Sequence, residues 1–400
     1  MPPFDSVWFA TLSAAERREL DLESPPKILK TPDVLVVGGG IIGLATAYFL
    51  ADRGARVQLV EAESLAAGAS GGNAGGIWPN DQGPSHAAGF QQLAFLSRDL
   101  WGRLSLCPDF DFDWRVNGFL NVDPEKFSPS AVACAASFQD LGYTVHAVDS
   151  EQISMLEPNL RPGLRSGLHG PSEAHVHPVK AALSLARAAC KKGANITIGV
   201  AAHSIISNGE RLMRVDTSAG PIEPRFVVSA TGWTAEWLRQ SVTELPPLRS
   251  VSGQLISTDP LPRLLNGSVG GKFILLQLRS GEVITGGSLQ ESESVTPDRD
   301  LSDRFADAAR ELVPKLQDAA FTRAWCGQRP ATPDGLPVID RAPGFDNLFL
   351  ATGHYRNGVL LAPATGKLLS EWILSGEQPQ ELVPFNANRL TTPDKTPLRH

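Results

Sequence analysis

The feature that most constrains this chain is a triple glycine between an apolar β-branched run and a helical pattern. The segment Asp33–Glu61 reads DVLVVGGGIIGLATAYFLADRGARVQLVE, and its Gly38, Gly40 and Gly43 fit the spacing G-x-G-x-x-G. In such a unit the first glycine permits a tight turn, and the second lets the backbone approach a pyrophosphate. The third lets helix and strand pack closely. The pattern therefore predicts a dinucleotide-binding turn.

The residues around the glycines complete a strand–turn–helix–strand unit. Ile41 and Ile42 open the helix, whose unpaired N–H groups and positive dipole end favour phosphate. Glu61, followed by Ala62, ends the second strand. An acid at this spacing accepts a hydrogen bond from a ribose hydroxyl of the dinucleotide. The uncharged run 34–51 approaches transmembrane length, but the glycines favour a turn and no second span follows. We therefore expect an adenine dinucleotide site and no transmembrane segment.

Composition indicates a soluble globular chain. Its 400 residues favour two domains, and its 42% hydrophobic and 20% charged residues are ordinary for such proteins. A net charge of −7 without a basic run argues against a nucleic-acid partner. The start has no apolar core of the kind a secretory signal needs, so we expect a cytoplasmic protein. Scattered cysteines indicate a reducing compartment without structural zinc: Cys107, Cys134, Cys190 and Cys326.

Four separated segments together resemble one family. They read VVGGGIIGLATAYFLADRGARVQLVE, GASGGNAGGI, WCGQRPATPDGLPVID and LFLATGHYRNGVLLAPATG. The chain is similar, from about Asp33 to Trp372, to the FAD-dependent oxidoreductases of the D-amino-acid oxidase superfamily, and most closely to their glycine oxidase branch. The resemblance implies FAD as the cofactor, together with a small-molecule amino acid or amine substrate. The sequence leaves open whether the chain forms a homo-oligomer.

The resemblance also implies which residues lie along FAD. Small side chains let backbone N–H groups reach the phosphates and the flavin ring, and a helix N-terminus favours the charge of reduced flavin. Beyond the glycine turn, the implied cofactor residues are Ser70, Asn73, Ala74, Gly75, Gly76, Ile77, Ala202, Thr231, Gly232, Gly327, Arg329, Gly353, Arg356, Asn357, Gly358 and Val359.

Substrate recognition would rest on arginine. The resemblance places Arg329, in GQRP, where the family grips the substrate carboxylate, with Arg356 as a second cation. A guanidinium holds a carboxylate by two parallel hydrogen bonds. The alternative is that either arginine makes a domain salt bridge. His354 borders the flavin turn as a further catalytic candidate, although a structural imidazole is the alternative. Phe273 stands where glycine oxidases have a tyrosine, which makes the pocket more apolar and puts glycine in doubt as the preferred substrate.

The mode of FAD attachment also follows from the resemblance. Sarcosine oxidases of this superfamily attach flavin through a cysteine just before the TPD segment, and here that position is Gly327. Cys326 is one residue off, so its thiol would point the wrong way. We expect non-covalent FAD.

Three further patterns carry less weight. The segment 68–72 satisfies G-x-S-x-G, but a nucleophile elbow joins a strand directly to a helix and this segment lies in a long small-residue loop. His175 and His177 alternate, yet no third ligand has metal-site spacing, so we expect no metal. His177 is instead expected at the start of a helix. Trp8 and Phe9 are expected to pack on a neighbouring surface or a second subunit.

The expected fold is α/β (α+β overall), a Rossmann-like FAD-binding domain with an inserted antiparallel sheet and helices. The domain is discontinuous because the glycine units at the front and the back of the chain must meet one cofactor. The predicted division is an N-terminal arm over 1–31, an FAD-binding domain over 32–97, 152–238 and 326–376, a substrate-binding domain over 98–151 and 239–325, and a C-terminal tail over 377–400.

The predicted reaction oxidises the C–N bond of an amino acid or related carboxylate-bearing amine. Hydride would pass to flavin N5, the resulting imine would hydrolyse, and electrons would pass to O2. One alternative is a D-amino-acid or secondary-amine dehydrogenase that uses a quinone or carrier. Another is an FAD-binding subunit of a hetero-oligomeric complex.

Overall fold

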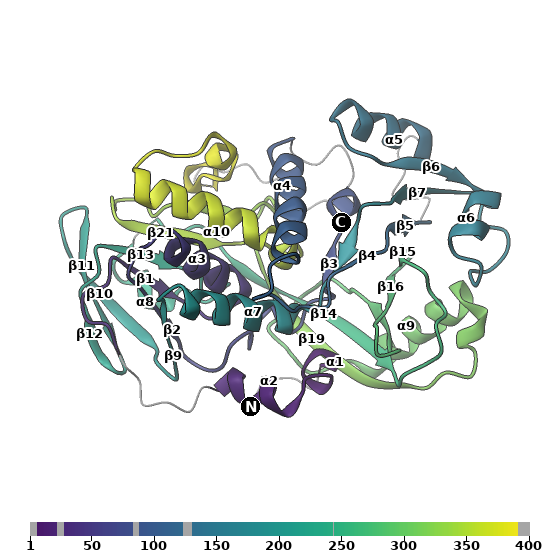
Figure 1. Ribbon diagram of the computed structural model, residues 1–400, viewed down its shortest axis with the longest axis horizontal. Helices are drawn as coiled ribbons and strands as arrows, with labels where there is room; N and C mark the ends of the chain where they lie inside the picture. The colour runs from purple at the N-terminus through teal and green to yellow at the C-terminus, as the bar shows by residue number, and fades with distance from the viewer. Residues whose placement is uncertain (1–5, 22–27, 83–87, 123–129, 243, 391–400) are drawn as a thin grey trace.

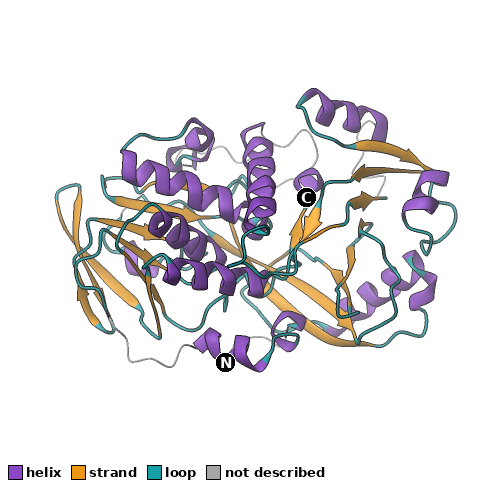
Figure 2. Cartoon of the chain, viewed as in Figure 1, coloured by secondary structure: helices purple, strands orange, loops and turns teal. Residues whose placement is uncertain are grey.

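The computed structural model describes residues 6–21, 28–82, 88–122, 130–242 and 244–390. Two large sheets dominate it, one at each end of the elongated molecule (Figures 1 and 2). One sheet is mainly parallel and covered by helices, and the other is mainly antiparallel. In the described part, no helix combines the length and apolar character needed to cross a membrane.

The first sheet has six strands in the order β20-β21-β13-β1-β2-β9, parallel except for the edge pair β20-β21. Its strands are β1 (Val34–Val37), β2 (Val57–Glu61), β9 (Asn195–Ile198), β13 (Phe226–Ser229), β20 (Val338–Arg341) and β21 (Leu348–Thr352). The strand β1 is buried on both faces, as its unbroken β-branched run favours. The predicted Rossmann-like unit is confirmed.

Helices and a small sheet cover opposite faces of this parallel sheet. One face carries α3 (Ile41–Asp52), α7 (Pro178–Lys191) and α10 (Gly358–Ser375), and α4 (Ala88–Leu104) packs on α10. The other face carries the antiparallel strands β10 (Ala202–Asn208), β11 (Arg211–Thr217) and β12 (Gly220–Ile222). Alternate residues of β1 join the cores on the two faces.

The second sheet is long and mostly antiparallel. Its order is β18-β14-β17-β16-β15-β5-β7-β6, with β19 paired to β14. These strands are β5 (Phe119–Asn121), β6 (His146–Asp149), β7 (Ser166–Gly170), β14 (Arg249–Thr258), β15 (Ser268–Gly270), β16 (Ile274–Gln277), β17 (Val283–Gly286), β18 (Gln290–Glu291) and β19 (Phe321–Ala331). The helices α5 (Ala131–Asp140), α6 (Ser150–Leu156) and α9 (Arg299–Leu312) accompany it, whereas α8 (Glu236–Arg239) follows β13.

Short elements connect these layers. A three-stranded sheet of β3 (Gly76–Ile77), β8 (Ala174–His175) and β4 (Arg115–Val116) lies between the two large sheets. The N-terminal arm contributes α1 (Val7–Ala10) and α2 (Ala14–Asp21), which pack on α7. The arm therefore packs on its own chain. After α10, the 3-10 turn Gln380–Phe385 buries Leu382 and Phe385.

A discontinuous division into two domains remains our proposal, with two adjustments. The strand β7 falls in the segment 152–238 that was assigned to the FAD-binding domain, yet it pairs with β5 and β6 of the antiparallel sheet. The strand β19 also crosses the predicted boundary at residue 326 while paired with β14. We place β7 and the whole of β19 with the second sheet.

Candidate active site

The glycine turn after β1 is held by two close backbone approaches. Gly38 has φ +114°, and an added Cβ would stand 2.5 Å from the Ala230 carbonyl oxygen. An added Cβ at Gly43 would stand 2.0 Å from the Gly38 carbonyl oxygen. Both distances are too short for any side chain. These glycines therefore bring the start of α3 close to the ends of β1 and β13.

Two polar side chains organise the backbone N–H groups of this turn. The Ser70 hydroxyl accepts a hydrogen bond from the Ile41 N–H at 3.0 Å, at the start of α3. Glu61 accepts from the N–H groups of Gly39 at 2.5 Å and Glu63 at 2.8 Å. Burial raises the pKa of the Glu61 carboxyl, while these N–H groups oppose the shift. Glu61 stands at the edge of a cavity that begins here.

This first cavity has a volume of about 600 Å³ and crosses the ends of the parallel strands. A hollow at the carboxyl ends of parallel strands is the usual dinucleotide position in such sheets. The predicted cofactor residues that line it are Gly38, Gly40, Ile41, Ile42, Glu61, Ala62, Ser70, Asn73, Ala202, Thr231, Gly232, Gly358 and Val359. The glycine cradle and Glu61 fit the pyrophosphate and ribose of FAD, and we propose that these residues hold it.

Some predicted cofactor residues lie elsewhere. Gly43, Gly75, Ile77 and Gly353 line neither this cavity nor the second one below. Gly75 packs behind the loop, because an added Cβ would meet the Val176 carbonyl oxygen at 2.3 Å. Ile77 is fully buried in the core. Gly75 and Ile77 support the loop from behind, whereas Gly353 packs against Thr332 in the turn before α10. Contact of these residues with the cofactor stays a prediction.

His354 lines the first cavity, but its geometry favours the structural alternative. Its Nε2 lies 3.1 Å from the Thr365 hydroxyl of α10, and the imidazole is 3% exposed. Burial lowers its pKa to about 3, so the ring stays neutral at neutral pH. A neutral imidazole bonded to α10 fixes the flavin turn against that helix. We assign it no catalytic role.

A second cavity of about 240 Å³ adjoins the first, and Ala69, Asn73 and Tyr355 line both. It lies against the antiparallel sheet, and its walls include Leu255, Phe273 and Leu289. Six predicted residues line it with Asn73: Ala74, Gly76, Gly327, Arg329, Arg356 and Asn357. The structure therefore brings both candidate arginines to one hollow beside the cofactor cavity.

Arg329 is the most exceptional group in this second cavity. Its Nη1 donates to the Ser288 carbonyl oxygen at 2.7 Å, and its guanidinium lies on Gly253. Burial, with repulsion from Arg356, lowers the pKa of Arg329 to about 10. Among the described residues no carboxylate lies within 4.0 Å of it. Arg329 is partly buried, and a cation withdrawn from water without a carboxylate partner favours an anionic ligand at this place.

Arg356 is held differently. Its Nη2 lies 3.8 Å from the Asp81 carboxylate, and its guanidinium lies 5.9 Å from the centre of the Tyr355 ring. Asp81 balances part of its charge, so Arg329 is the better anchor for a ligand carboxylate. The alternative that Arg356 makes a domain salt bridge is therefore supported only in part, because its ion pair with Asp81 is long.

Sequence reasoning missed several residues that line the second cavity. Trp78, Asn121 and Lys272 line it, and Trp78 stacks on Phe119 at 4.8 Å between ring centroids. Tyr355 has φ +48°, a conformation that non-glycine residues rarely adopt outside functional or strained sites. The residue was visible in the GHYRNG segment, but its backbone conformation has no sequence signature.

Cys326 lines neither cavity. Its sulfur lies 3.8 Å from Gln254 Oε1, on the face of β19 opposite to Gly327 and Arg329. Burial raises the pKa of the Cys326 thiol, which leaves little thiolate for bond formation. The position and chemistry of this cysteine favour non-covalent FAD.

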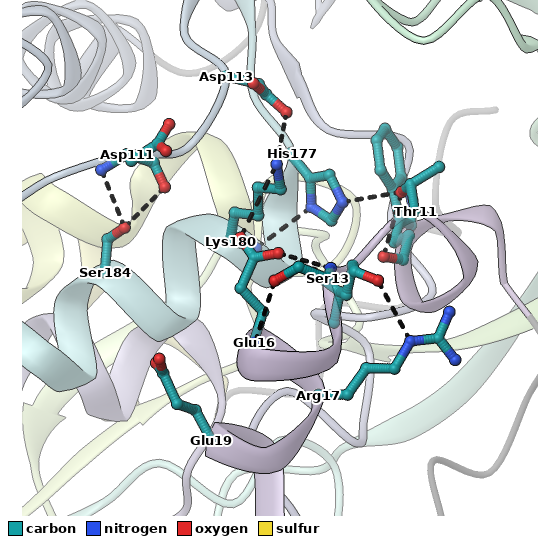
Figure 3. Close-up of polar contacts among 12 residues, drawn as sticks. Thr11, Ser13, Glu16, Arg17, Glu19, Asp111, Asp113, His177, Lys180 and Ser184 are labelled. Carbon is teal, nitrogen blue, oxygen red and sulfur yellow. Dashed lines mark hydrogen bonds and ion pairs between the residues drawn. The ribbon is translucent and has the colours of Figure 1, made fainter.

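The remaining patterns resolve into structural roles. His177 caps α7, because its Nδ1 accepts the Lys180 N–H at 3.2 Å, as predicted (Figure 3). His175 instead lies 3.3 Å from Asn117 Oδ1. The described residues hold no group of three histidine, cysteine or acidic side chains suited to a metal. Ser70 of the G-x-S-x-G segment caps α3 rather than forming a nucleophile elbow.

Comparison with known proteins agrees with this geometry. The sequence profile of a family described as FAD dependent oxidoreductase matches residues 33–372. The chain belongs to that family. It is 33% identical to a glycine oxidase of Pseudomonas aeruginosa, over 86% of this chain and 95% of the relative. It is 26% identical to the hydrogen cyanide synthase subunit HcnC of the same organism, over 90% of this chain and 96% of the relative.

Solved structures extend the agreement to three dimensions. Glycine oxidase from Geobacillus kaustophilus superposes with a TM-score of 0.83 at 27% identity, covering 90% of this chain and 99% of its own. The L-proline dehydrogenase of P. horikoshii shares the fold, with a TM-score of 0.84 at 21% identity, covering 93% and 100%. The protein is therefore an FAD-dependent oxidoreductase with the fold of these flavoenzymes.

Proposed function

We propose that this oxidoreductase oxidises the C–N bond of an amino acid or a related carboxylate-bearing amine. The observation that carries the proposal is Arg329, a partly buried guanidinium that faces the second cavity and has no carboxylate partner among the described residues. A substrate carboxylate would supply the missing charge through two parallel hydrogen bonds. The names of the glycine oxidase relatives support the same class of substrate.

The residues of the second cavity would bind and orient the substrate. Arg329 would hold the carboxylate at the sheet side, and the apolar part of the wall, which includes Leu255 and Leu289, would exclude water from the neutral amine. Bound FAD would supply the chemistry by accepting a hydride and passing two electrons to an acceptor. No acid–base group needs to act on the carbon, because binding and orientation provide most of the protein's contribution. The imine product would hydrolyse in water.

The cavity also supports a substrate larger than glycine. Phe273 lines it where the family's tyrosine would offer a hydroxyl, and its ring packs on Phe305 at 4.5 Å. Leu255, Ile274 and Leu289 also line the cavity, together with the polar Asn121 and Lys272. An apolar side chain or N-substituent gains about 25 cal/mol for each Å² that it buries there. We therefore propose amines that carry an apolar substituent in preference to glycine.

Anaerobic flavin reduction tests this proposal directly. The holoenzyme is mixed without air with glycine, sarcosine, D-amino acids and larger secondary amines, and loss of the oxidised flavin absorbance is followed. Arg329→Ala should weaken carboxylate substrates by about 100-fold or more while FAD stays bound, because a charge-assisted bidentate pair is lost. Arg323→Ala, on the same strand β19 but lining neither cavity, is the matched control. Unchanged reduction kinetics in Arg329→Ala would refute the assignment.

The electron acceptor is a separate proposal. We propose O2, with a quinone or carrier protein as the alternative. After anaerobic reduction, admission of air should reoxidise the flavin and yield peroxide. Slow reoxidation by air together with fast reduction of a dye would favour the dehydrogenase. The similarity to a protein named as a hydrogen cyanide synthase subunit also supports testing for a partner-dependent activity. Flavin that no amine reduces in the isolated chain would favour that form.

A further inference from the structure

The N-terminal arm is buried against the loop between the two cavities. The side chains of Val7 and Trp8 are 1% exposed, and that of Phe9 is 5% exposed. The short helix α1 packs on α7 and lies at the bottom of the view in Figure 1. The family profile begins at residue 33, so this arm lies outside the matched part of the chain.

Two aromatic side chains of the arm contact the small-residue loop directly. The Trp8 indole N–H donates to the Asn73 carbonyl oxygen at 2.6 Å. The Phe9 ring packs so closely on Gly71 that an added Cβ there would stand 2.7 Å from its Cζ. The Trp8 ring also approaches Gly75, where an added Cβ would stand 3.4 Å from Cη2. Both rings therefore lie on the side of the loop that faces away from the cavities.

The position of this loop matters because it forms a wall of both cavities. Asn73 lines the cofactor cavity and the substrate cavity, and Gly72 lines the second. The Asn73 side-chain oxygen accepts a hydrogen bond from the Gly75 N–H at 2.6 Å, which stabilises a turn of the backbone at residues 73–75. Glycine-rich backbone loses much entropy when it is ordered, and it has few side chains to hold it. Contacts from outside the loop must therefore keep its backbone ordered.

The arm is itself fastened to α7 by several polar contacts (Figure 3). The Thr11 hydroxyl lies 3.1 Å from His177 Nε2, and the Lys180 ammonium lies 3.2 Å from the Asp113 carboxylate and 3.8 Å from that of Glu16. Figure 3 shows these side chains meeting between α2 and the start of α7. The Trp8 ring also packs edge-on against the His177 ring, 5.0 Å between centroids. The arm thus joins the loop to a rigid helix.

We propose that Trp8 is a positioning residue for FAD, acting through the Asn73 carbonyl, with Phe9 as its support. The indole hydrogen bond and the packing on Gly71 hold segment 70–76 in the form that accepts the cofactor. The inference rests on the proposed placement of FAD along this segment, and it does not depend on which amine is oxidised. It assigns a cofactor-linked role to a region outside the family profile.

Equilibrium FAD binding tests the proposal without any turnover. Trp8→Phe keeps an aromatic ring but removes the N–H donor and leaves the Asn73 carbonyl oxygen without it. FAD added back to the apoprotein should bind about fivefold to tenfold more weakly than to the native chain, as measured by quenching of flavin fluorescence. Amide hydrogen exchange in residues 70–76 should also be faster, and added FAD should only partly restore protection.

A control substitution at a second buried tryptophan distinguishes the positioning role of Trp8 from a general loss of packing. Trp372, near the C-terminal end of α10, is 4% exposed and packs on Phe349 at 5.3 Å. Trp372→Phe should lower the melting temperature with FAD affinity within twofold of native. An FAD dissociation constant for Trp8→Phe within twofold of native would overturn the proposal, whatever its melting temperature.

A second variant keeps the test decisive if Trp8→Phe does not fold. Thr11→Val removes the hydroxyl that lies 3.1 Å from His177 Nε2, and it leaves the side chains of Trp8 and Phe9 unchanged. It should weaken FAD binding by a smaller factor of about two to three and raise hydrogen exchange in both the arm and segment 70–76. Faster exchange in the arm alone, with native FAD affinity, would also overturn the proposal. Because both readouts need no substrate, failure of the amine-oxidation proposal would not change them.

Discussion

The guanidinium of Arg329 lies directly against the Cα of Gly253 on the neighbouring strand. A Cβ added to Gly253 would stand 1.9 Å from Nη1 and 2.0 Å from Nη2 of Arg329. The register of β14 and β19 pairs Gly253 with Gly327, so Gly253 is the diagonal neighbour of Arg329 on the face that lines the second cavity. The missing side chain at residue 253 therefore creates the space that the guanidinium occupies.

Gly253→Ala should impair substrate binding and leave the fold intact. The colliding atoms are the far end of a flexible side chain, so the guanidinium moves while the strands stay paired. Displacement of about 1 Å can cost up to about 100-fold in a site that relies on orientation, and we expect kcat/KM for carboxylate amines to fall at least about tenfold. Gly102→Ala, where the nearest atom to the new Cβ is 3.8 Å away, is the control. Native kcat/KM in Gly253→Ala would contradict the role of Gly253.

Ser70→Ala should destabilise the apoprotein. The Ser70 hydroxyl accepts the hydrogen bond of the buried Ile41 N–H at the start of α3, and loss of such a cap costs about 1 kcal/mol in the free energy of unfolding. Ser64→Ala is the matched control, because the Ser64 hydroxyl is buried without a hydrogen-bond partner among the described residues. Urea unfolding of both apoproteins measures the difference. Equal unfolding free energies would show that the Ser70 hydroxyl does not cap the helix.

Local patterns predicted the parts of this fold whose signals lie in neighbouring residues. The glycine spacing gave the turn after β1, and His177-Pro178 gave the start of α7. These signals are backbone requirements, namely a positive φ, a cap and a proline at the first helical position. The candidate substrate arginine, Arg329, came from resemblance alone, because nothing near it in sequence shows that its guanidinium is partly buried.

Contacts between distant segments could not be predicted in this way. Trp8 and Asn73 lie 65 residues apart, and no pattern in either segment indicates that the indole meets that carbonyl group. The assignment of β7 to the antiparallel sheet depends likewise on pairing with β5 and β6, which tertiary packing decides. The diagonal contact of Gly253 with Arg329 needs the register of two strands. Register follows from the whole sheet rather than from local sequence.

Acid precipitation should release all the flavin from the native protein. Cys326 faces Gln254 and lines neither cavity, so its sulfur has no path to the cofactor. Yellow colour should appear in the supernatant after precipitation, and Cys326→Ser should behave in the same way with FAD affinity near native. Flavin that stays with the precipitate of the native protein but not with that of Cys326→Ser would show a covalent bond to this residue.

Stability should fall as the pH falls below 6.5, and His177 should account for part of the loss. Burial, followed by repulsion from Lys180, lowers the pKa of His177 from 6.5 to about 4, although Asp113 and Glu16 oppose the shift. Above pH 6.5 the imidazole is neutral in both the folded and the unfolded chain. Between pH 6.5 and 4 the unfolded chain takes up a proton that the folded chain does not, so the free energy of unfolding falls by roughly 3 kcal/mol for this group.

His177→Asn isolates this contribution, because asparagine also caps helices and does not titrate. With excess FAD present, the urea midpoint of the native protein should drop between pH 7.5 and 5 by more than that of His177→Asn. His203→Asn, at an exposed position of β10, should follow the native protein. His175 and His354, whose burial lowers their pKa values to about 3, should maintain a residual acid sensitivity in every variant. Identical pH dependence in the native protein and His177→Asn would show that the pKa of this imidazole is the same in the folded and the unfolded chain.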